Sequence, residues 1–300
     1  MRTSWEDFLP SAARSVAIAE THILSEYAEI VDLDALMTTV SANPRYVIGG
    51  AGSIDAISDR VGVRQYYARQ FLPLAWRPRT QIVSDWYLFH EGVGTRQQRS
   101  SAEQYSLSNC VLLPVVDDGI VGEWSWARQS PAGAIRSDDS TSLPEKTLLN
   151  LSLHEEIVQA MQVGETSKIA ANMSKKFVLA RNYGSDVSSV QPMIMATSKQ
   201  DALRHFKAGD SNLGSTTVSV IQRQVTDWYI FAECLVTSHG NPDWNERRMA
   251  TIYGIDEEGK LESELSYCAD GVAPRGPALG TGRAIYKRRD YTDNLVESRQ

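Results

Sequence analysis

The sequence predicts an α+β fold in which two domains of the same kind follow one another. The first observation is an internal repeat, because "QIVSDWYLFHEG" at 81–92 returns as "RQVTDWYIFAEC" at 223–234. The second is the order of patterns in each copy, where helical spacing precedes runs of β-branched and aromatic residues. The third is the length of 300 residues with 42% hydrophobic content, which suits two cores in domains of about 150 residues each.

The repeat extends over nearly the whole chain. Besides the Asp-Trp-Tyr segments, the aligned blocks are 21–50 with 153–181, 62–71 with 198–207, and 117–126 with 257–267. The alignment places His22 opposite His154 and Glu123 opposite Glu264. Four blocks in the same order indicate a duplication. One difference stands out within the best-matched block, where His90 of the first copy is replaced by Ala232 in the second.

Composition suggests where the domains begin and end. The stretch "RQSPAGAIRSDDSTSLPEK" at 128–146 is rich in Ser, Pro, Gly and Asp, so it cannot bury enough apolar area to order itself. We expect a first domain at 1–130, a linker at 131–146 and a second domain at 147–273. The Gly- and Pro-rich end at 274–300 is expected to be an extended tail.

Each copy has a readable order of elements. In the first copy, apolar spacings of three and four over 14–40 predict an amphipathic helix pair divided near Asp32, and 60–72 predicts another short helix. Extended runs are predicted at 80–93, 103–116 and 119–129, with a "DDG" hairpin signal before the last. The second copy predicts the corresponding runs at 216–237, 246–255 and 260–269. Helices followed by an antiparallel meander indicate a sheet that helices cover on one face.

Charge and cysteine content exclude several classes of protein. The net charge of -7 and the pI near 5.3 argue against binding to nucleic acid or to an anionic membrane. Three widely spaced cysteines form neither a zinc motif nor a disulfide framework. Charged residues interrupt any signal-peptide core near the start, and no stretch of about 18 apolar residues occurs. We therefore expect a soluble, cytoplasmic protein with a small-molecule substrate.

The helix "GVRQYYARQF" at 62–71 and the closing strand "ESELSYCADGV" at 262–272 resemble the SnoaL-like branch of the nuclear transport factor 2-like (NTF2-like) superfamily. The resemblance implies two tandem cone domains, each a curved antiparallel sheet wrapped around about three helices and enclosing an apolar cavity. It also implies catalysis without metal or organic cofactor, by Asp, Glu, His and Tyr inside that cavity. The first copy departs from the pattern, because it has Gln129 where the second supplies Asp270. Members often dimerise through sheet faces, which implies a homo-oligomer or an intrachain pseudo-dimer.

The acidic candidates are carboxylates that the repeat places on strands. Strand alternation puts Tyr87 and Glu91 on one face and His90 on the other, with the same arrangement for Tyr229 and Glu233. A carboxylate among aromatic residues is expected to be half-buried, which raises its pKa and suits proton exchange near neutral pH. The alternative is that these carboxylates lie in water or pair with an arginine such as Arg45 or Arg181.

Glu123 and Glu264 form a second pair of acidic candidates, next to the predicted hairpins. On the family's topology, each of them could share a cavity with the preceding carboxylate of its own copy, and two carboxylates in one apolar pocket have separated pKa values. The alternative is an exposed strand edge. Asp270 is a further candidate, provided that the strand ends before it.

Histidines and tyrosines complete the candidate set. His22 and His154 occupy matching helix positions, either as pocket residues or as satisfied packing residues. His90 is either an interface residue or a catalyst that only the first copy has. The tyrosines that could donate a hydrogen bond to an oxyanion, or simply belong to the core, are Tyr27, Tyr87, Tyr183 and Tyr229. His22 and Glu26 have the spacing of metal ligands, but a third ligand is missing, so no metal is expected.

Two functions are compatible with these candidates. The first is a cofactor-independent lyase, isomerase or hydratase that acts on a small, largely apolar substrate by carboxylate and histidine acid–base catalysis. In the second copy, Glu233 or Glu264 would be the base, and in the first copy Glu91, Glu123 and His22 would act. The alternative is a non-catalytic small-molecule-binding or protein-assembly module of the same fold.

Overall fold

The computed structural model divides into two compact units. The first unit comprises Met1–Asp139 with Pro274–Gln300, and the second comprises Ser140–Ala273. The structure describes residues 5–27, 31–50, 53–68, 71–116, 119–129, 144–182, 193–213, 216–239, 247–269, 279–280 and 286–287. Helix α4 begins at Pro144, within the stretch expected to be a linker, and two short strands of the expected tail join the sheet of the first unit.

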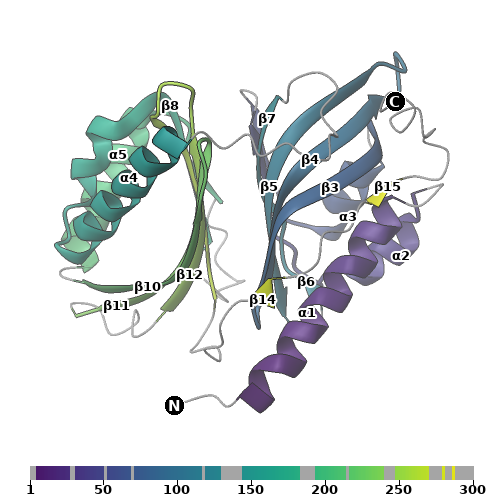
Figure 1. Cartoon of the computed structure of the whole chain (residues 1–300), viewed down its shortest axis with the longest axis horizontal. Helices are drawn as coiled ribbons and strands as arrows, with labels where there is room; N and C mark the ends of the chain where they lie inside the picture. Colours follow the sequence, from purple (N-terminus) through teal and green to yellow (C-terminus); the bar gives the residue numbers. More distant parts are fainter. Residues whose placement is uncertain are drawn as a thin grey trace. The chain divides into compact units, whose positions relative to one another are not determined.

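The first unit is a curved sheet with helices on one face (Figure 1). Its helices are α1 (Trp5–Glu26), α2 (Leu33–Thr38) and α3 (Arg60–Tyr67). Its strands are β1 (Tyr46–Gly50), β2 (Ser53–Ile57), β3 (Phe71–Val83), β4 (Tyr87–Gln98), β5 (Gln104–Val116), β6 (Gly119–Ile120), β7 (Trp124–Gln129), β14 (Leu279–Gly280) and β15 (Tyr286–Lys287). The described strand order is β14-β3-β4-β5-β7-β1-β2, with β15 paired to β3 and β6 to β5.

The second unit repeats this architecture. Its helices are α4 (Pro144–Gln162), the 3-10 helix η1 (Thr166–Asn172) and α5 (Lys199–Leu213). Its strands are β8 (Met173–Asn182), β9 (Ile194–Ala196), β10 (Thr216–Val225), β11 (Tyr229–Ser238), β12 (Arg247–Ile255) and β13 (Leu261–Cys268). Their order, β10-β11-β12-β13-β8-β9, matches β3-β4-β5-β7-β1-β2 of the first unit. In both units the closing strand pairs in parallel with the first one, so the predicted α+β class and duplication are confirmed.

The repeated Asp-Trp-Tyr segment forms a hairpin turn in both units. The backbone N–H of Ser84 donates to the carbonyl of Tyr87 at 2.9 Å, and Thr226 does the same to Tyr229 at 3.0 Å. The extended runs predicted over 80–93 and 216–237 therefore each divide into two antiparallel strands. Asp favours such turns because its side chain bonds to nearby backbone groups, and the aromatic Tyr that follows begins the next strand.

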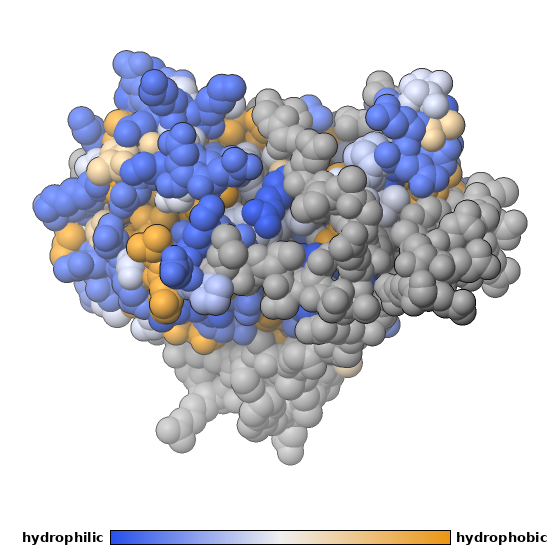
Figure 2. All heavy atoms as spheres, turned by 45° about the horizontal axis from the view of Figure 1, so that its top comes forward, coloured by the Kyte–Doolittle hydropathy of each residue, from blue (hydrophilic) through white to orange (hydrophobic). Residues whose placement is uncertain are grey.

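Apolar side chains fill the space between each sheet and its helices. In the first unit, Ala12 and Ala19 of α1 pack against Leu88 of β4 and Val111 of β5. The coloured part of the surface is mostly hydrophilic, with small separate hydrophobic areas (Figure 2). Among the described helices, none combines the length and the hydropathy that a membrane span requires.

Candidate functional site

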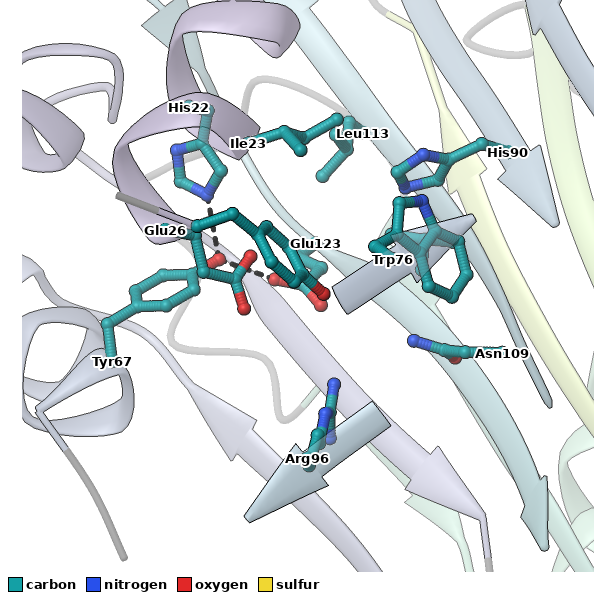
Figure 3. A pocket seen from close by; sticks show the side chains of 12 residues that line it. His22, Ile23, Glu26, Tyr67, Trp76, His90, Arg96, Asn109, Leu113 and Glu123 are labelled. Atoms are coloured by element: carbon teal, nitrogen blue, oxygen red, sulfur yellow. Dashed lines mark hydrogen bonds between the residues drawn. The ribbon is translucent and has the colours of Figure 1, made fainter. Parts of the chain in front are cut away.

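A small cavity lies between the helices and the sheet of the first unit, with a volume of about 40 Å³. This space is enough for a few atoms and exceeds what a single water needs. The helical side of its lining consists of His22, Ile23, Glu26, Tyr27 and Tyr67. The strand side consists of Trp76, His90, Arg96, Asn109, Val111, Leu113 and Glu123, the last directly before β7 (Figure 3). Ionisable groups from both layers therefore converge on one buried space.

A chain of hydrogen bonds crosses the wall of this cavity. The hydroxyl of Tyr67 donates to Oε2 of Glu123 at 2.6 Å. Nε2 of His22 lies 2.8 Å from the same hydroxyl (Figure 3). Nδ1 of His22 lies 2.7 Å from Oγ1 of Thr39. The ring of His22 meets that of Tyr67 edge to face, with centroids 5.2 Å apart. Helices α1 and α3 and the loop before β7 thus connect through one polar path.

Burial sets the proton affinities in this path. Burial raises the pKa of Glu123, although the hydrogen bond from Tyr67 and the charge of Arg96 act in the opposite direction. Burial, with a smaller contribution from His90, lowers the pKa of His22 to about 3. Burial also lowers the pKa of His90 to about 4. At neutral pH both histidines are therefore neutral, while Glu123 holds its proton more tightly than an ordinary carboxyl group does.

The sequence of β4 explains why the cavity exists in the first unit. His90, Gly92, Gly94 and Arg96 alternate onto the helix-facing side of the strand. The two glycines add no side chain, and a Cβ built on Gly94 would lie 3.3 Å from Cε3 of Trp76.

In the second unit Cys234 and Val236 take the places of Gly92 and Gly94, and Ala232 takes the place of His90. Ala232, Cys234 and Val236 are buried there and pack in one cluster with Val158 of α4. The two glycines of the first unit's strand are thus replaced by buried side chains in the second unit.

The acidic candidates of the second unit are paired with arginines. Glu264 accepts hydrogen bonds from Nε of Arg181 at 2.7 Å and from Nη2 at 2.6 Å. The guanidinium of Arg181 also lies 5.0 Å from the ring centre of Phe206. Glu233 accepts from Nε of Arg248 at 2.7 Å, and the side chains of both are buried. These carboxylates are therefore held as ion pairs. Pairing with an arginine was the alternative expected for Glu233, whereas the alternative expected for Glu264 was an exposed strand edge.

The structure separates the other predicted residues. Glu91, Tyr87 and Tyr229 are buried on the sheet face opposite to the helices, so Glu91 does not share the cavity with His90. Nη1 of Arg79 lies 3.8 Å from Oε1 of Glu91. His154 is buried on α4 with Nδ1 at 3.4 Å from Nη1 of Arg223.

The pKa of His154 is lowered to about 4, by burial first and then by Arg223. Asp270 and Tyr183 lie outside the described residues. Within the described part of the chain, no three His, Cys, Asp or Glu side chains are grouped as a metal site would require.

Several cavity residues were not predicted as site residues. Of these, Tyr67 is the central one, because it joins His22 to Glu123. The repeat did contain an indication of this, because the second copy has Leu203 where the first copy has Tyr67, and the two copies therefore differ at this position. Residues whose role no local pattern indicated are Thr39, Trp76, Arg96 and Asn109. Trp76, Arg96 and Asn109 reach the cavity from neighbouring strands, and Thr39, directly after α2, contacts His22. Their spacing along the chain does not reveal this.

Comparisons with known proteins concern the fold alone. No family model matches the sequence, and no curated protein matches it. An NTF2-like protein from Anabaena variabilis is 14% identical, covers 47% of this chain and 97% of its own, and gives a TM-score of 0.34. An NTF2-like protein of unknown function from Mesorhizobium loti is 11% identical, covers 41% of this chain and 93% of its own, and gives a TM-score of 0.33.

A SnoaL-like protein of unknown function from Burkholderia thailandensis is 9% identical, covers 41% of this chain and 95% of its own, and gives a TM-score of 0.33. Each of these matches spans less than half of the chain, about the length of one unit. The strand order and the placement of the helices in each unit carry the fold assignment by themselves. The chain is a tandem of two α+β units and resembles NTF2-like and SnoaL-like proteins, as the sequence motifs predict.

Proposed function

We propose that the first unit is a cofactor-independent acid–base catalyst of the isomerase or lyase type, acting on a small substrate. The observation that carries this proposal is the buried Glu123, which has a raised pKa and a hydrogen-bonded path to His22 through Tyr67. Catalytic carboxyl groups in cavities are tuned in this way so that they exchange protons near neutral pH.

The proposed reaction begins with proton transfer from carbon. The carboxylate of Glu123 takes a proton from a carbon next to a substrate carbonyl, and the electron pair of the broken C–H bond moves onto the carbonyl oxygen as an enolate forms. The positive charge of Arg96, which lines the same cavity, favours the negative charge that develops. Glu123 then returns the proton to a different atom, which completes an isomerisation, or the enolate expels a leaving group, which completes an elimination.

The hydrogen-bonded path satisfies both protonation states of Glu123. When Glu123 is ionised, Tyr67 donates to it, Nε2–H of His22 donates to Tyr67, and Thr39 donates to Nδ1. When Glu123 is protonated, its own O–H bonds to Tyr67, whose hydroxyl turns to Nε2, and Nδ1–H then donates to Thr39. Thr39 also lies 2.6 Å from the carbonyl of Leu36 and can donate to it in this second state. Each hydroxyl and ring nitrogen of the path keeps a partner in either state, which lowers the free-energy cost of proton transfer.

For the second unit we propose a non-catalytic role in binding or assembly. The ion pairs Glu264–Arg181 and Glu233–Arg248 support this, because each carboxylate is already engaged by the guanidinium next to it. The absence of the histidine supports it as well, since Ala232 takes the place of His90 in the second unit.

Deuterium exchange tests the proposed catalysis. A panel of small ketones and hydroxyketones is incubated with the protein in D₂O, and proton NMR follows the loss of signal at the carbon next to the carbonyl. We expect exchange with the wild type and a loss of at least about 100-fold with Glu123→Gln, the typical contribution of one acid–base group. Glu91→Gln is the matched control, because Glu91 lies on the same sheet but faces away from the cavity. Equal exchange by wild type and Glu123→Gln would contradict the proposal.

A further inference from the structure

Three polar atoms on the strand side of the cavity have no hydrogen-bond partner in the structure. They are Nε1 of Trp76, Nδ1 of His90 and Oδ1 of Asn109. The three side chains come from the adjacent strands β3, β4 and β5, and all of them line the cavity (Figure 3). Their exposed fractions are 5%, 5% and 6%, so bulk water does not satisfy them.

Such a group of atoms is unusual in a folded protein. More than nine in ten buried polar groups have a hydrogen-bond partner, because burying an unpaired polar group destabilises the folded state. Three unpaired atoms around one cavity therefore indicate positions that a bound molecule completes. The arrangement is also specific to the first unit, because the second has Ala232 at the place of His90.

The chemistry of the three atoms defines what they bind. The indole N–H of Trp76 can only donate, and Oδ1 of Asn109 can only accept. His90 is neutral at neutral pH, so its Nδ1 donates or accepts according to the tautomer. These three side chains thus offer a donor and an acceptor side by side and carry no charge of their own.

The charges of the cavity disfavour an anion. Glu26 and Glu123 contribute carboxyl groups to the lining, against a single guanidinium from Arg96. A bound carboxylate or phosphate would add negative charge to this buried space, where repulsion is poorly screened. A neutral polar molecule meets no such penalty.

We infer that Trp76, His90 and Asn109 form a recognition site for a small neutral hydroxycarbonyl compound. The carbonyl oxygen accepts from Nε1–H of Trp76, the hydroxyl donates to Oδ1 of Asn109, and Nδ1 of His90 bonds to either group. Trp76 is held in place because its ring packs over Gly94 and meets the ring of His90 edge to face at 5.3 Å. This inference rests on the proposed function, since it names the class of substrate that Glu123 would act on.

Binding of hydroxyacetone tests the inference, with acetone and lactate as the matched probes that lack the hydroxyl or carry a charge. Nitrogen-15 NMR of the full chain follows the indole N–H signal of Trp76, which is assigned with Trp76→Phe. We expect hydroxyacetone to shift this signal and to bind at least about tenfold more tightly than acetone or lactate, the effect of one well-placed hydrogen bond. Equal binding of hydroxyacetone and acetone, or no binding of either, would overturn the inference.

A stability measurement gives a second readout that does not depend on the probe. Asn109→Leu removes an unpaired polar atom, so the ligand-free variant should melt at or above the temperature of the wild type while losing its preference for hydroxyacetone. Asn150→Leu is the control, because Nδ2 of Asn150 donates to the carbonyl of Thr226 at 2.7 Å and its loss should lower the melting temperature. A lower melting temperature for ligand-free Asn109→Leu would show that Asn109 is a structural residue and would overturn its assignment.

The two proposals fail in different ways. If hydroxyacetone binds but no deuterium exchange occurs, the recognition site stands and the proposed catalysis is wrong. If exchange occurs at equal rates with acetone and hydroxyacetone and without selective binding, the catalysis stands and the recognition site is wrong.

Discussion

The matched carboxylates Glu123 and Glu264 should respond in opposite directions to the same substitution. Glu264→Gln leaves the guanidinium of Arg181 without its charge partner in a site where the side chains are 20% and 5% exposed. Breaking a buried pair costs about 3–5 kcal/mol, and we expect the lower end, about 3 kcal/mol, because a part of Arg181 reaches solvent. For a unit of this size, that loss lowers the melting temperature by roughly 10 °C.

Glu123→Gln should not lower the free energy of unfolding in this way. The amide still accepts a hydrogen bond from Tyr67, and the substitution removes a carboxyl group whose ionisation burial opposes. The folded-state pKa of Glu123 is raised above its ordinary value of 4.5, so the stability it contributes is present at low pH and is lost as the pH rises through the folded pKa. The variant should therefore equal the wild type in acid and match or exceed it above that pKa.

Urea and thermal unfolding between pH 4 and pH 8 measure both effects. The double variant Arg181→Met with Glu264→Gln is the control, and it should recover most of the stability because it removes both charges. Equal losses for Glu123→Gln and Glu264→Gln at pH 7 would refute the distinction between a tuned carboxyl group and a structural ion pair.

Three further predictions concern the cavity of the first unit. Tyr67→Phe removes a hydrogen bond that lowers the pKa of Glu123, so carbon-13 titration should show this pKa higher than in the wild type; an unchanged or lower value would contradict the path. Because the pKa values of His22 and His90 are lowered to about 3 and about 4, the unfolded chain binds protons that the folded chain does not, and stability should fall as the pH drops from about 6.5 towards 4. Each of these histidines contributes up to about 1.4 kcal/mol per pH unit to the fall in the free energy of unfolding. His90→Gln should therefore make the free energy of unfolding, measured with urea, depend less steeply on pH. Gly94→Val, which copies the second unit, would press on the indole next to it and fill the cavity, so deuterium exchange should be lost while circular dichroism remains that of a folded protein; undiminished exchange would place the reaction elsewhere.

The sequence alone determined the architecture. Hydrophobic periodicity and the repeat predict helices and an antiparallel meander in each copy, and the neighbouring strands β3-β4-β5-β7 and β10-β11-β12-β13 confirm the meander. The strands β1, β2, β8 and β9 were not predicted; they precede the last helix of their unit, and β1 and β8 pair in parallel with β7 and β13. Alternation also indicates that His90 and Glu91 lie on opposite faces, which the position of His90 in the cavity agrees with. These features depend on the backbone and on local spacing, which a sequence displays directly. The turn within the Asp-Trp-Tyr segment was missed, since a continuous apolar pattern does not show where a strand reverses.

Tertiary structure alone decided which polar groups meet. Tyr67 lies 56 residues from Glu123 and 45 from His22 along the chain, and Arg181 lies 83 from Glu264, yet each pair is within hydrogen-bond distance. The spacing of residues along the sequence indicates on which face of a helix or strand a side chain lies. It does not indicate which side chain of a neighbouring element contacts it. Glu123 and Glu264, which have the same place in the repeat, therefore acquire different partners only when the chain is folded, a tyrosine hydroxyl in the first unit and a guanidinium in the second.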